Sequence, residues 1–257
     1  MDKILFICEG EKTEKKFCKF IIDKYFIQNH REKEYVAFKT NIYGLYDEMT
    51  KDDGLDIIEI IREKAKKQKD MYTYNLLSNG GFSEVYLIFD FEFQAPQYEY
   101  RKIKQMLNFF NNETEHGKLY INYPMIESYK HFKSIPDNNY NTYKVNKKDC
   151  LKYKEYISNI SIIPHFNDID NNILKIIIKQ NLEKYSLISN TIINTYSLYK
   201  LNFSQKKLLE IQYNSLKKDN NFYVINTILF WGIDYFGERK FNEYSSVEIK
   251  KIQEYVR

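Results

Sequence analysis

Two apolar runs mark the beginning of the chain as the start of an α/β fold. Ile4–Cys8 is continuously apolar, and Glu84–Phe89 (EVYLIF) is apolar after its first residue. Such runs are typical of strands that are covered on both faces of a parallel sheet. After the first run, Phe17, Phe20 and Ile21 recur at three- and four-residue spacing, which predicts a helix. A buried strand therefore leads into a helix.

The alternation of strand and helix patterns continues over residues 1–135. The predicted strands are Ile4–Cys8, Tyr35–Ile42, Glu84–Phe89 and Lys118–Asn122. The predicted helices are Glu14–Asn29, Gly54–Lys69, Tyr98–Phe110 and Met125–Phe132. Strands that alternate with helices predict a mostly parallel sheet with helices on its faces. Residues 1–135 are therefore predicted to form an α/β domain.

Beyond Pro136 the strand patterns stop, and helical spacing takes over. The segments with apolar residues at three- and four-residue spacing are Cys150–Asn159, Asn171–Tyr185, Ser204–Leu216, Phe222–Phe236 and Ser246–Val256. We therefore expect a domain boundary near residue 136, with a helical accessory region over residues 136–257.

Composition and charge exclude several classes of protein. The 257 residues are 43% hydrophobic and 17% aromatic, which is enough for a substantial core. The net charge of +4 is too small to indicate nucleic-acid binding without local basic patches. The three cysteines form no Cys-x-x-Cys pair and suggest neither a zinc site nor a disulfide framework. The first apolar run, of five residues, is too short for a signal peptide, and the longest later run, Val224–Ile233, is shorter than a membrane span. We therefore expect no membrane segment, and the cysteine pattern favours the reducing cytoplasm.

Acidic residues follow three of the predicted strands. Glu9 comes directly after the first strand, Asp90 and Glu92 follow the third, and Glu127 follows the fourth. Ligands of parallel α/β sheets bind at the carboxyl ends of the strands, so we expect these acids to converge on one edge of the sheet. Converging carboxylates repel one another unless a cation neutralises them, and their oxygen atoms suit Mg²⁺ or Mn²⁺. Metal-dependent phosphoryl chemistry is the resulting hypothesis.

The acids also lie in segments that resemble a known family. Glu9-Gly10 after an apolar strand, with Asp90-x-Glu92 after a second one, resembles the Toprim domain of topoisomerases, primases, overcoming-lysogenization-defect nucleases and ribosomal-RNA maturases. The string CEGEKTEKKF is similar to the RloB-like and abortive-infection branch of the family, as is YPMIESYKHF, which contains Glu127 and His131. The resemblance covers residues 1–135. It implies a stand-alone Toprim module that often accompanies an ATPase.

The resemblance implies roles for individual residues. Glu9 matches the first-motif glutamate, as a metal ligand or acid/base group, and Asp90 matches the first acid of the Asp-x-Asp motif. Glu92 stands where the family has a second Asp, so one or two metal ions are both compatible with the motif. Glu14 matches a second-site ligand on the first helix of some nuclease branches, and Glu127 is a further candidate ligand. Lys12 and His131 are expected to offset transition-state charge or to orient water.

Structural explanations compete with these roles. Glu14 and Glu127 could each simply place a negative charge at the positive end of a helix dipole. His131 could be an ordinary core or surface histidine, and the basic tract Arg62–Lys69 could be a solvated helix end. The lysines and tyrosines of residues 143–156 alternate as in single-strand binding grooves, although chance could produce this in a Lys- and Tyr-rich chain. GEKTE lacks the first glycine of a P-loop, which argues against an ATPase.

These observations lead to one functional hypothesis and two alternatives. We expect an Mg²⁺- or Mn²⁺-dependent nuclease that hydrolyses DNA or RNA, with tRNA as one candidate substrate, in anti-phage defence with an ATPase partner. A non-catalytic subunit that uses the Toprim fold as an interaction surface is the first alternative. A housekeeping nuclease of RNA maturation is the second. The helical region could clamp the substrate, dock a partner or form a homodimer.

Overall fold

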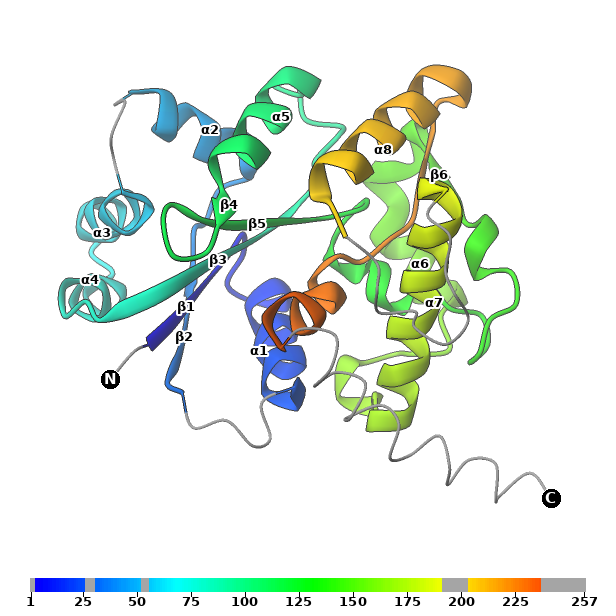
Figure 1. Cartoon of the computed structure of the whole chain (residues 1–257), viewed down its shortest axis with the longest axis horizontal. Coiled ribbons are helices and arrows are strands. Elements are labelled where there is room, and N and C mark those ends of the chain that lie inside the picture. The colour runs from blue at the N-terminus through cyan, green and yellow to red at the C-terminus, as the bar shows by residue number, and fades with distance from the viewer. Residues whose placement is uncertain (1–2, 26–30, 52–55, 191–202, 237–257) are drawn as a thin grey trace. The chain divides into compact units, whose positions relative to one another are not determined.

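The computed structural model describes residues 3–25, 31–51, 56–190 and 203–236 (Figure 1). The chain divides into two compact units, unit 1 from Met1 to Ile126 and unit 2 from Glu127 to Arg257. The boundary predicted from the sequence, near residue 136, falls later in the chain. None of the described helices is both long enough and apolar enough to cross a membrane.

Unit 1 is an α/β unit built on one five-stranded sheet. Its strands are β1 (Lys3–Cys8), β2 (Lys33–Ala37), β3 (Phe82–Asp90), β4 (Asn111–Asn112) and β5 (Gly117–Asn122), in the order β2-β1-β3-β5-β4. All pairs are parallel except the short β4–β5 pair at the edge. The predicted fold class, a mostly parallel sheet flanked by helices, is confirmed.

Among the described residues, five helices connect these strands. They are α1 (Thr13–Tyr25), α2 (Ile42–Lys51), α3 (Ile57–Lys67), α4 (Met71–Ser78) and α5 (Tyr100–Phe109). The connection from β1 to β2 runs in one direction along the sheet, and the connections from β2 to β3 and from β3 to β5 run in the other. Right-handed crossovers then place α1 on one face and the other helices on the opposite face. Figure 1 shows α1 on one side of the strands and α2 and α5 on the other.

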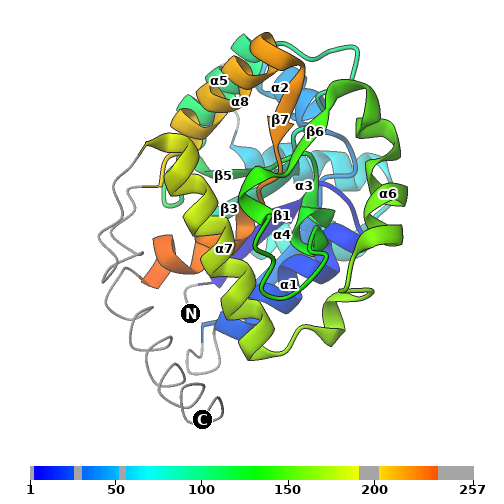
Figure 2. The same ribbon diagram turned by 90° about the vertical axis from the view of Figure 1, so that its right-hand side faces the viewer.

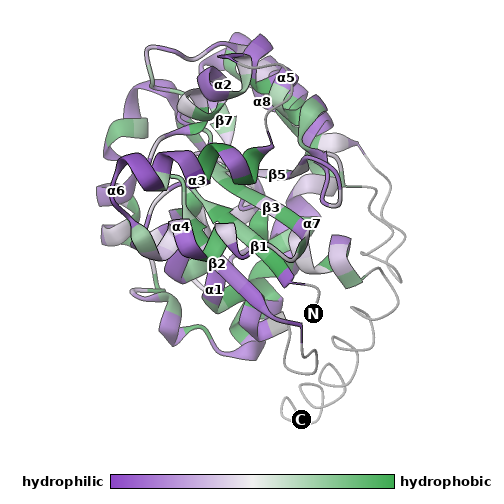
Figure 3. Ribbon diagram, turned by 90° about the vertical axis from the view of Figure 1, so that its left-hand side faces the viewer, coloured by the Kyte–Doolittle hydropathy of each residue, from purple (hydrophilic) through white to green (hydrophobic). Residues whose placement is uncertain are grey.

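The centre of the sheet is apolar, as the sequence predicts for strands covered on both faces. Ile4–Cys8 is fully buried, and Val85–Asp90 is also buried. These strands are coloured as hydrophobic in Figure 3. Burial of one such aliphatic or aromatic side chain contributes about 1.5–3 kcal/mol. This core fixes where β1 and β3 end, and so fixes the backbone position of the acids that follow them.

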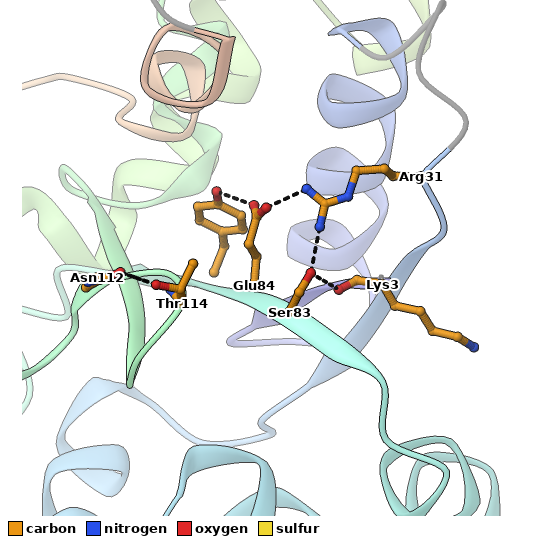
Figure 4. A network of polar contacts seen from close by, with 7 residues as sticks. Lys3, Arg31, Ser83, Glu84, Asn112 and Thr114 are labelled. Atoms are coloured by element: carbon orange, nitrogen blue, oxygen red, sulfur yellow. Dashed lines mark hydrogen bonds and ion pairs between the residues drawn. The ribbon is translucent and has the colours of Figure 1, made fainter. Parts of the chain in front are cut away.

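A polar network closes the opposite, amino-terminal end of the sheet (Figure 4). Arg31 forms an ion pair with Glu84 and donates a hydrogen bond to Ser83 Oγ at 2.7 Å. The Ser83 hydroxyl in turn donates to the carbonyl oxygen of Lys3 at 3.4 Å, and Tyr86 donates to Glu84 at 2.9 Å. The network joins the segment before β2 to β1 and β3. It also pairs Glu84, the acid of the EVYLIF run, with a nearby cation.

Unit 2 is largely helical (Figure 2). Its α-helices are α6 (Tyr153–Ile160), α7 (Asn171–Ser189) and α8 (Gln205–Asp219). Its 3-10 helices are η1 (Ile126–Lys130, which begins at the last residue of unit 1), η2 (Tyr140–Thr142), η3 (Lys147–Lys152), η4 (Phe166–Asp168) and η5 (Ile228–Phe230). Two short strands, β6 (Lys144–Asn146) and β7 (Asn221–Tyr223), pair antiparallel.

Several predicted elements differ from the structure. The segment Phe222–Phe236 was expected to be one helix, but it begins within β7 and becomes helical only later. The run FYVINTILFW is almost continuously apolar, so it fits a strand and a helix equally well. The expected strand Tyr35–Ile42 ends at Ala37, and α2 begins at Ile42. The expected helix Met125–Phe132 is the 3-10 helix η1, and Ser246–Val256 lies outside the described residues.

Two helices of unit 1 were not predicted at all. Helix α2 has Gly44 in its first half, and glycine lowers helix propensity. Helix α4 follows Lys69, which has a left-handed backbone with φ 58°, and begins with Asp70 as its N-cap. The Asp70 carboxylate accepts a hydrogen bond from the Thr73 N–H at 3.1 Å. Both helices are short, and α4 carries only two buried side chains, so the apolar periodicity in the sequence is weak.

Candidate active site

The carboxyl ends of β1 and β3 lie side by side at the point where the strand order reverses. The chain leaves β1 toward β2 on one side, and all later crossovers lead to the other side of β1. The register pairs Cys8 of β1 with Ile88 of β3. Ligands of open α/β sheets bind in the crevice at such a switch point. Glu9 follows β1 directly, and Asp90 is the last residue of β3.

Glu9 and Asp90 are in direct contact at this switch point. The Glu9 main-chain N–H donates to the Ile88 carbonyl oxygen at 3.0 Å and continues the pairing of the two strands. The Glu9 side chain then turns toward β3, where its Oε2 accepts a hydrogen bond from the Asp90 N–H at 3.1 Å. Residues 81 positions apart in sequence are thereby held together at the edge of the sheet.

Asp90 is almost fully buried and is fixed by a main-chain donor. Only 6% of the residue is exposed, and its Oδ1 accepts a hydrogen bond from the Ile126 N–H at 2.8 Å. Asn122, the last residue of β5, lies directly opposite Asp90 in the register and is fully buried. Asn122 was not predicted to belong to the site, although a polar residue that ends the apolar strand KLYIN is the same signal that identified Asp90.

Glu14 packs against the turn that follows β1. A Cβ atom added to Gly10 would lie 2.5 Å from Glu14 Oε2, so glycine leaves the room that this carboxylate occupies. On α1, Glu14 shares the face of the buried Phe17 and Cys18 and therefore points toward the sheet. This position is compatible with both interpretations of Glu14, as a negative charge in the first turn of a helix and as a ligand of the site. The contact with Gly10 brings Glu14 to the same turn as Glu9.

Glu92 has an unusual backbone and a shifted pKa. Its φ of 43° lies in the left-handed region, which costs free energy for a residue with a Cβ atom. Its Oε2 accepts a hydrogen bond from Gln94 Nε2 at 2.8 Å. Burial raises the pKa of Glu92, and the nearby negative charge of Glu14 raises it further. The switch point therefore gathers negative charge from β1, α1 and the segment after β3.

Tyr43 is a neighbour of the site that the sequence analysis did not identify. It lies on α2, is almost fully buried, and its hydroxyl donates to the Phe91 carbonyl oxygen at 3.4 Å. Burial raises the pKa of Tyr43, and the negative charges of Glu92 and Glu9 add to the increase. Tyr43 thus supports the short segment that carries Asp90 and Glu92. Because α2 was not predicted, no sequence signal placed Tyr43 near the acids.

Lys39 is a second residue that the sequence analysis missed. It follows β2 with a left-handed φ of 65°, and its N–H donates to the Glu9 carbonyl oxygen at 2.9 Å. Its ammonium group forms ion pairs with Glu11 at 2.8 Å and Asp70 at 2.9 Å. Hydrogen bonds to these two carboxylates raise the pKa of Lys39. Lys12, the predicted cation, is exposed in the turn before α1.

Glu127 and His131, the remaining predicted site residues, belong to unit 2. Glu127 is 2% exposed and forms an ion pair with Lys154. His131 is equally buried, and its Nδ1 shares a hydrogen bond of 3.0 Å with the Tyr153 hydroxyl. The imidazole ring also stacks on Tyr143 at a centroid distance of 4.7 Å. Both side chains are therefore parts of the interior of unit 2 rather than solvent-exposed groups.

The donor chemistry of the sheet edge fits a divalent cation. Glu9 and Asp90 form one contacting pair, and Glu14 and Glu92 form a second pair that interacts electrostatically. Carboxylate oxygens are the ligands that Mg²⁺ and Mn²⁺ prefer. Within the described ranges, no group of three or more His, Cys, Asp or Glu residues is arranged to hold a metal ion as it stands. Binding by more than two of these carboxylates would therefore require side chains to rotate.

The chain was also compared with known proteins. No family model, curated protein or solved structure matches it. The chemistry of the site follows from its own geometry and charge: four carboxylates and a tyrosine lie at the switch point of a mostly parallel sheet.

Burial of His131 leads to a pH-dependent stability. Burial lowers the pKa of His131 from 6.5 to about 3, and the positive charges of Lys184 and Lys133 add to the decrease, whereas Asp137 opposes it. The folded protein then keeps the imidazole neutral, while the unfolded chain takes up a proton below pH 6.5. This contribution to the free energy of unfolding is therefore intact above pH 6.5 and is lost progressively as pH falls toward 3. The loss amounts to about 2 kcal/mol at pH 5.

Urea unfolding at pH 7 and pH 5 measures this loss, with the fluorescence of Trp231, the single tryptophan, as a reporter of unit 2. Replacing His131 by asparagine keeps a polar atom near the position of Nδ1 but removes the titrating group. The variant should lose about 2 kcal/mol less than the unsubstituted protein between the two pH values. An equal loss in both proteins would show that His131 is not the group responsible.

Proposed function

We propose that the chain is a divalent-metal-dependent phosphodiesterase of the Toprim type that hydrolyses DNA or RNA. One observation carries the proposal: the Glu9 carboxylate is hydrogen-bonded to the main chain of Asp90 at the switch point of the sheet. The order of the two motifs along the chain is the one that the Toprim resemblance implies, and their acids lie at the ends of paired strands. Glu14 and Glu92 add two further carboxylates to the same edge.

In this proposal Glu9, Asp90 and Glu92 hold the cation, with Glu14 as a further ligand. A bound Mg²⁺ or Mn²⁺ would polarise the scissile phosphate and lower the pKa of a water molecule. A water oxygen forms a bond to phosphorus, one ester P–O bond breaks, and the water proton passes to a carboxylate of this edge. The leaving oxygen takes up a proton from solvent. Lys12 lies in the adjacent exposed turn and offsets negative charge on the phosphate.

The chain's own residues orient this chemistry. The Ile126 N–H fixes one oxygen of Asp90 at 2.8 Å, and the Tyr43 hydroxyl supports the carbonyl group between Asp90 and Glu92. The Lys39 N–H fixes the carbonyl oxygen of Glu9 at 2.9 Å. Ligands held by such second contacts bind metal more tightly than mobile ones. By the family resemblance, the cellular role is defence against phage with an ATPase partner, and tRNA is one possible substrate.

A second candidate is a regulatory subunit that keeps the Toprim-like unit as an interaction surface and does not cut. The same hydrogen bonds favour it, because Glu9 and Asp90 each accept a bond from a main-chain N–H and so help to hold the sheet edge together. Under this interpretation the acids stabilise unit 1 and bind Mg²⁺ weakly or not at all.

Incubation with a panel of nucleic acids tests the first proposal against the second. Labelled tRNA, single-stranded DNA and duplex DNA are incubated with the purified protein in EDTA, Mg²⁺ or Mn²⁺, and products are separated on denaturing gels. A phosphodiesterase should give products that depend on the cation and on its concentration. If no substrate is cut with either cation while a purified complex with a partner protein is stable, the regulatory interpretation replaces it.

A further inference from the structure

A cluster of aromatic rings surrounds the buried His131 in unit 2. Tyr143 stacks on the imidazole with an interplanar angle of 19°, and Tyr156 meets it edge to face at a centroid distance of 5.9 Å. Tyr153 is buried beside them and shares the hydrogen bond with His131 Nδ1. The Tyr143 hydroxyl donates to Asp137 Oδ2 at 3.0 Å. Packing and hydrogen bonds within unit 2 therefore hold the rings of this cluster in place.

One ring of this cluster faces solvent. Tyr156 is 46% exposed, although its position on α6 is fixed by the buried neighbours Tyr153 and Ile157. Exposed apolar side chains also lie before and after it in the sequence: Leu151 is 79% exposed and Ile162 is 56% exposed. A rigid, half-exposed tyrosine loses little conformational freedom when it stacks on a planar partner.

Lysines accompany the exposed ring. The Lys133 ammonium lies 5.6 Å from the centroid of the Tyr143 ring. Lys152 is exposed and is the N-cap residue of α6, four positions before Tyr156. Exposed lysines of the adjoining segment are Lys147, Lys148 and Lys154, of which Lys154 pairs with the buried Glu127. The exposed acids of residues 147–160 are Asp149 and Glu155. Exposed lysines therefore outnumber exposed acids in the segment that carries the exposed ring.

We propose that one surface of unit 2 binds single-stranded nucleic acid. This surface, here called the α6 patch, consists of Tyr143, Tyr156, Lys133 and Lys152. Tyr156 stacks on an unpaired base, while the lysines contact phosphates on either side. Exposed aromatics with interspersed lysines bind single strands in this way, because every unpaired base offers a π face and every linkage a negative charge. A duplex fits less well, since its bases are already stacked on one another. The inference rests on the proposed function and names single strands as its preferred substrate.

Binding of a labelled oligothymidylate of about twelve nucleotides tests the patch. Fluorescence anisotropy is measured in EDTA, so that cleavage cannot occur. The comparison probe is an abasic strand with the same number of phosphates. The unsubstituted protein should bind the oligothymidylate more tightly than the abasic strand and than a duplex of equal length. Tyr156→Ala should weaken binding to the oligothymidylate on the order of tenfold and leave binding to the abasic strand unchanged.

Two control variants separate stacking from other effects. Tyr156→Phe keeps the ring and should bind as tightly as the unsubstituted protein. Tyr72→Ala removes a tyrosine of α4 in unit 1 that is 68% exposed and should also leave binding unchanged. Equal affinity for the base-containing and abasic strands, or unaltered binding by Tyr156→Ala, would overturn the proposal. So would a preference for the duplex.

The lysines provide a second measurement that does not depend on the Tyr156 variant folding. The double variant Lys133→Gln, Lys152→Gln should reduce the slope of log K against log salt by about 0.7 for each lost phosphate contact with a single strand. An unchanged slope argues against the patch. These binding measurements need no divalent ion. Binding through the patch without any cleavage would therefore contradict the proposed reaction but not the α6 patch. Cleavage by a protein whose binding is unchanged by Tyr156→Ala would contradict the α6 patch but not the proposed reaction.

Discussion

Replacing Asp90 by asparagine is expected to lower the rate of phosphodiester cleavage by about a thousandfold or more while the fold stays intact. Asparagine keeps an Oδ1 atom that can accept the hydrogen bond from the Ile126 N–H, now 2.8 Å long. It loses the negative charge that would hold a divalent cation. A thousandfold decrease corresponds to about 4 kcal/mol of transition-state stabilisation, which is in the range that a bound metal ion supplies.

Glu9→Gln follows the same logic and should give a similar loss, because glutamine keeps an acceptor for the Asp90 N–H. Glu11→Gln is the matched control: Glu11 lies two residues further along, is exposed, and pairs with Lys39. Its cleavage rate should remain within a few fold of that of the unsubstituted protein. Initial rates in Mg²⁺ and Mg²⁺ binding by calorimetry are measured alongside thermal unfolding. Cleavage at the original rate by folded Asp90→Asn protein would eliminate the proposed site.

Replacing Asn181 by leucine is expected to destabilise unit 2 by about 3–5 kcal/mol. Asn181 is fully buried on α7, where its Oδ1 accepts hydrogen bonds from the Tyr140 hydroxyl at 2.7 Å and from the Asn226 N–H at 2.9 Å. Its Nδ2 donates to the Ile177 carbonyl oxygen at 2.9 Å. Leucine has a similar volume but leaves two buried donors without this acceptor, and each costs about 1–3 kcal/mol.

Urea unfolding followed by Trp231 fluorescence should show a lower midpoint with an unchanged m-value. Asn172→Leu, the same substitution at an exposed position of α7, should change the free energy of unfolding by no more than about 0.5 kcal/mol. Adding Tyr140→Phe to Asn181→Leu removes one of the two donors and should recover part of the loss. Equal stability of the Asn181 and Asn172 variants would mean that the buried hydrogen bonds do not organise unit 2.

Much of unit 1 could be predicted because burial there is a local pattern. The fully buried run Ile4–Cys8 and the buried end of β3 are continuous apolar segments, which few structures other than a covered strand accommodate. In unit 2 the same rule failed at Phe222–Phe236, because a continuous apolar run has no period of its own. There the pairing of β7 with β6, 75 residues earlier, decided the conformation.

For the candidate site, the sequence identified strand-end acids but not their supporting residues. Asn122 ends β5 opposite Asp90, and Lys39 binds the Glu9 carbonyl group through its main chain. Tyr43 reaches the site from a helix that the sequence did not predict. These contacts depend on which strands and helices are neighbours, and a strand's own sequence does not specify its neighbour.

The amino-acid sequence by itself determined that the buried runs of β1 and β3 end near Cys8 and Phe89 and that acids follow them, since both features are properties of short contiguous segments. Only the tertiary structure decided that β1 lies next to β3, so that Glu9 contacts the main chain of Asp90. It also decided that Glu14 packs against Gly10 and that His131 is a buried, neutral side chain of unit 2. The physical reason lies in distances between residues that are far apart in the sequence. Electrostatic repulsion, desolvation and hydrogen bonding depend on these distances, and the periodicity of a single segment does not encode them.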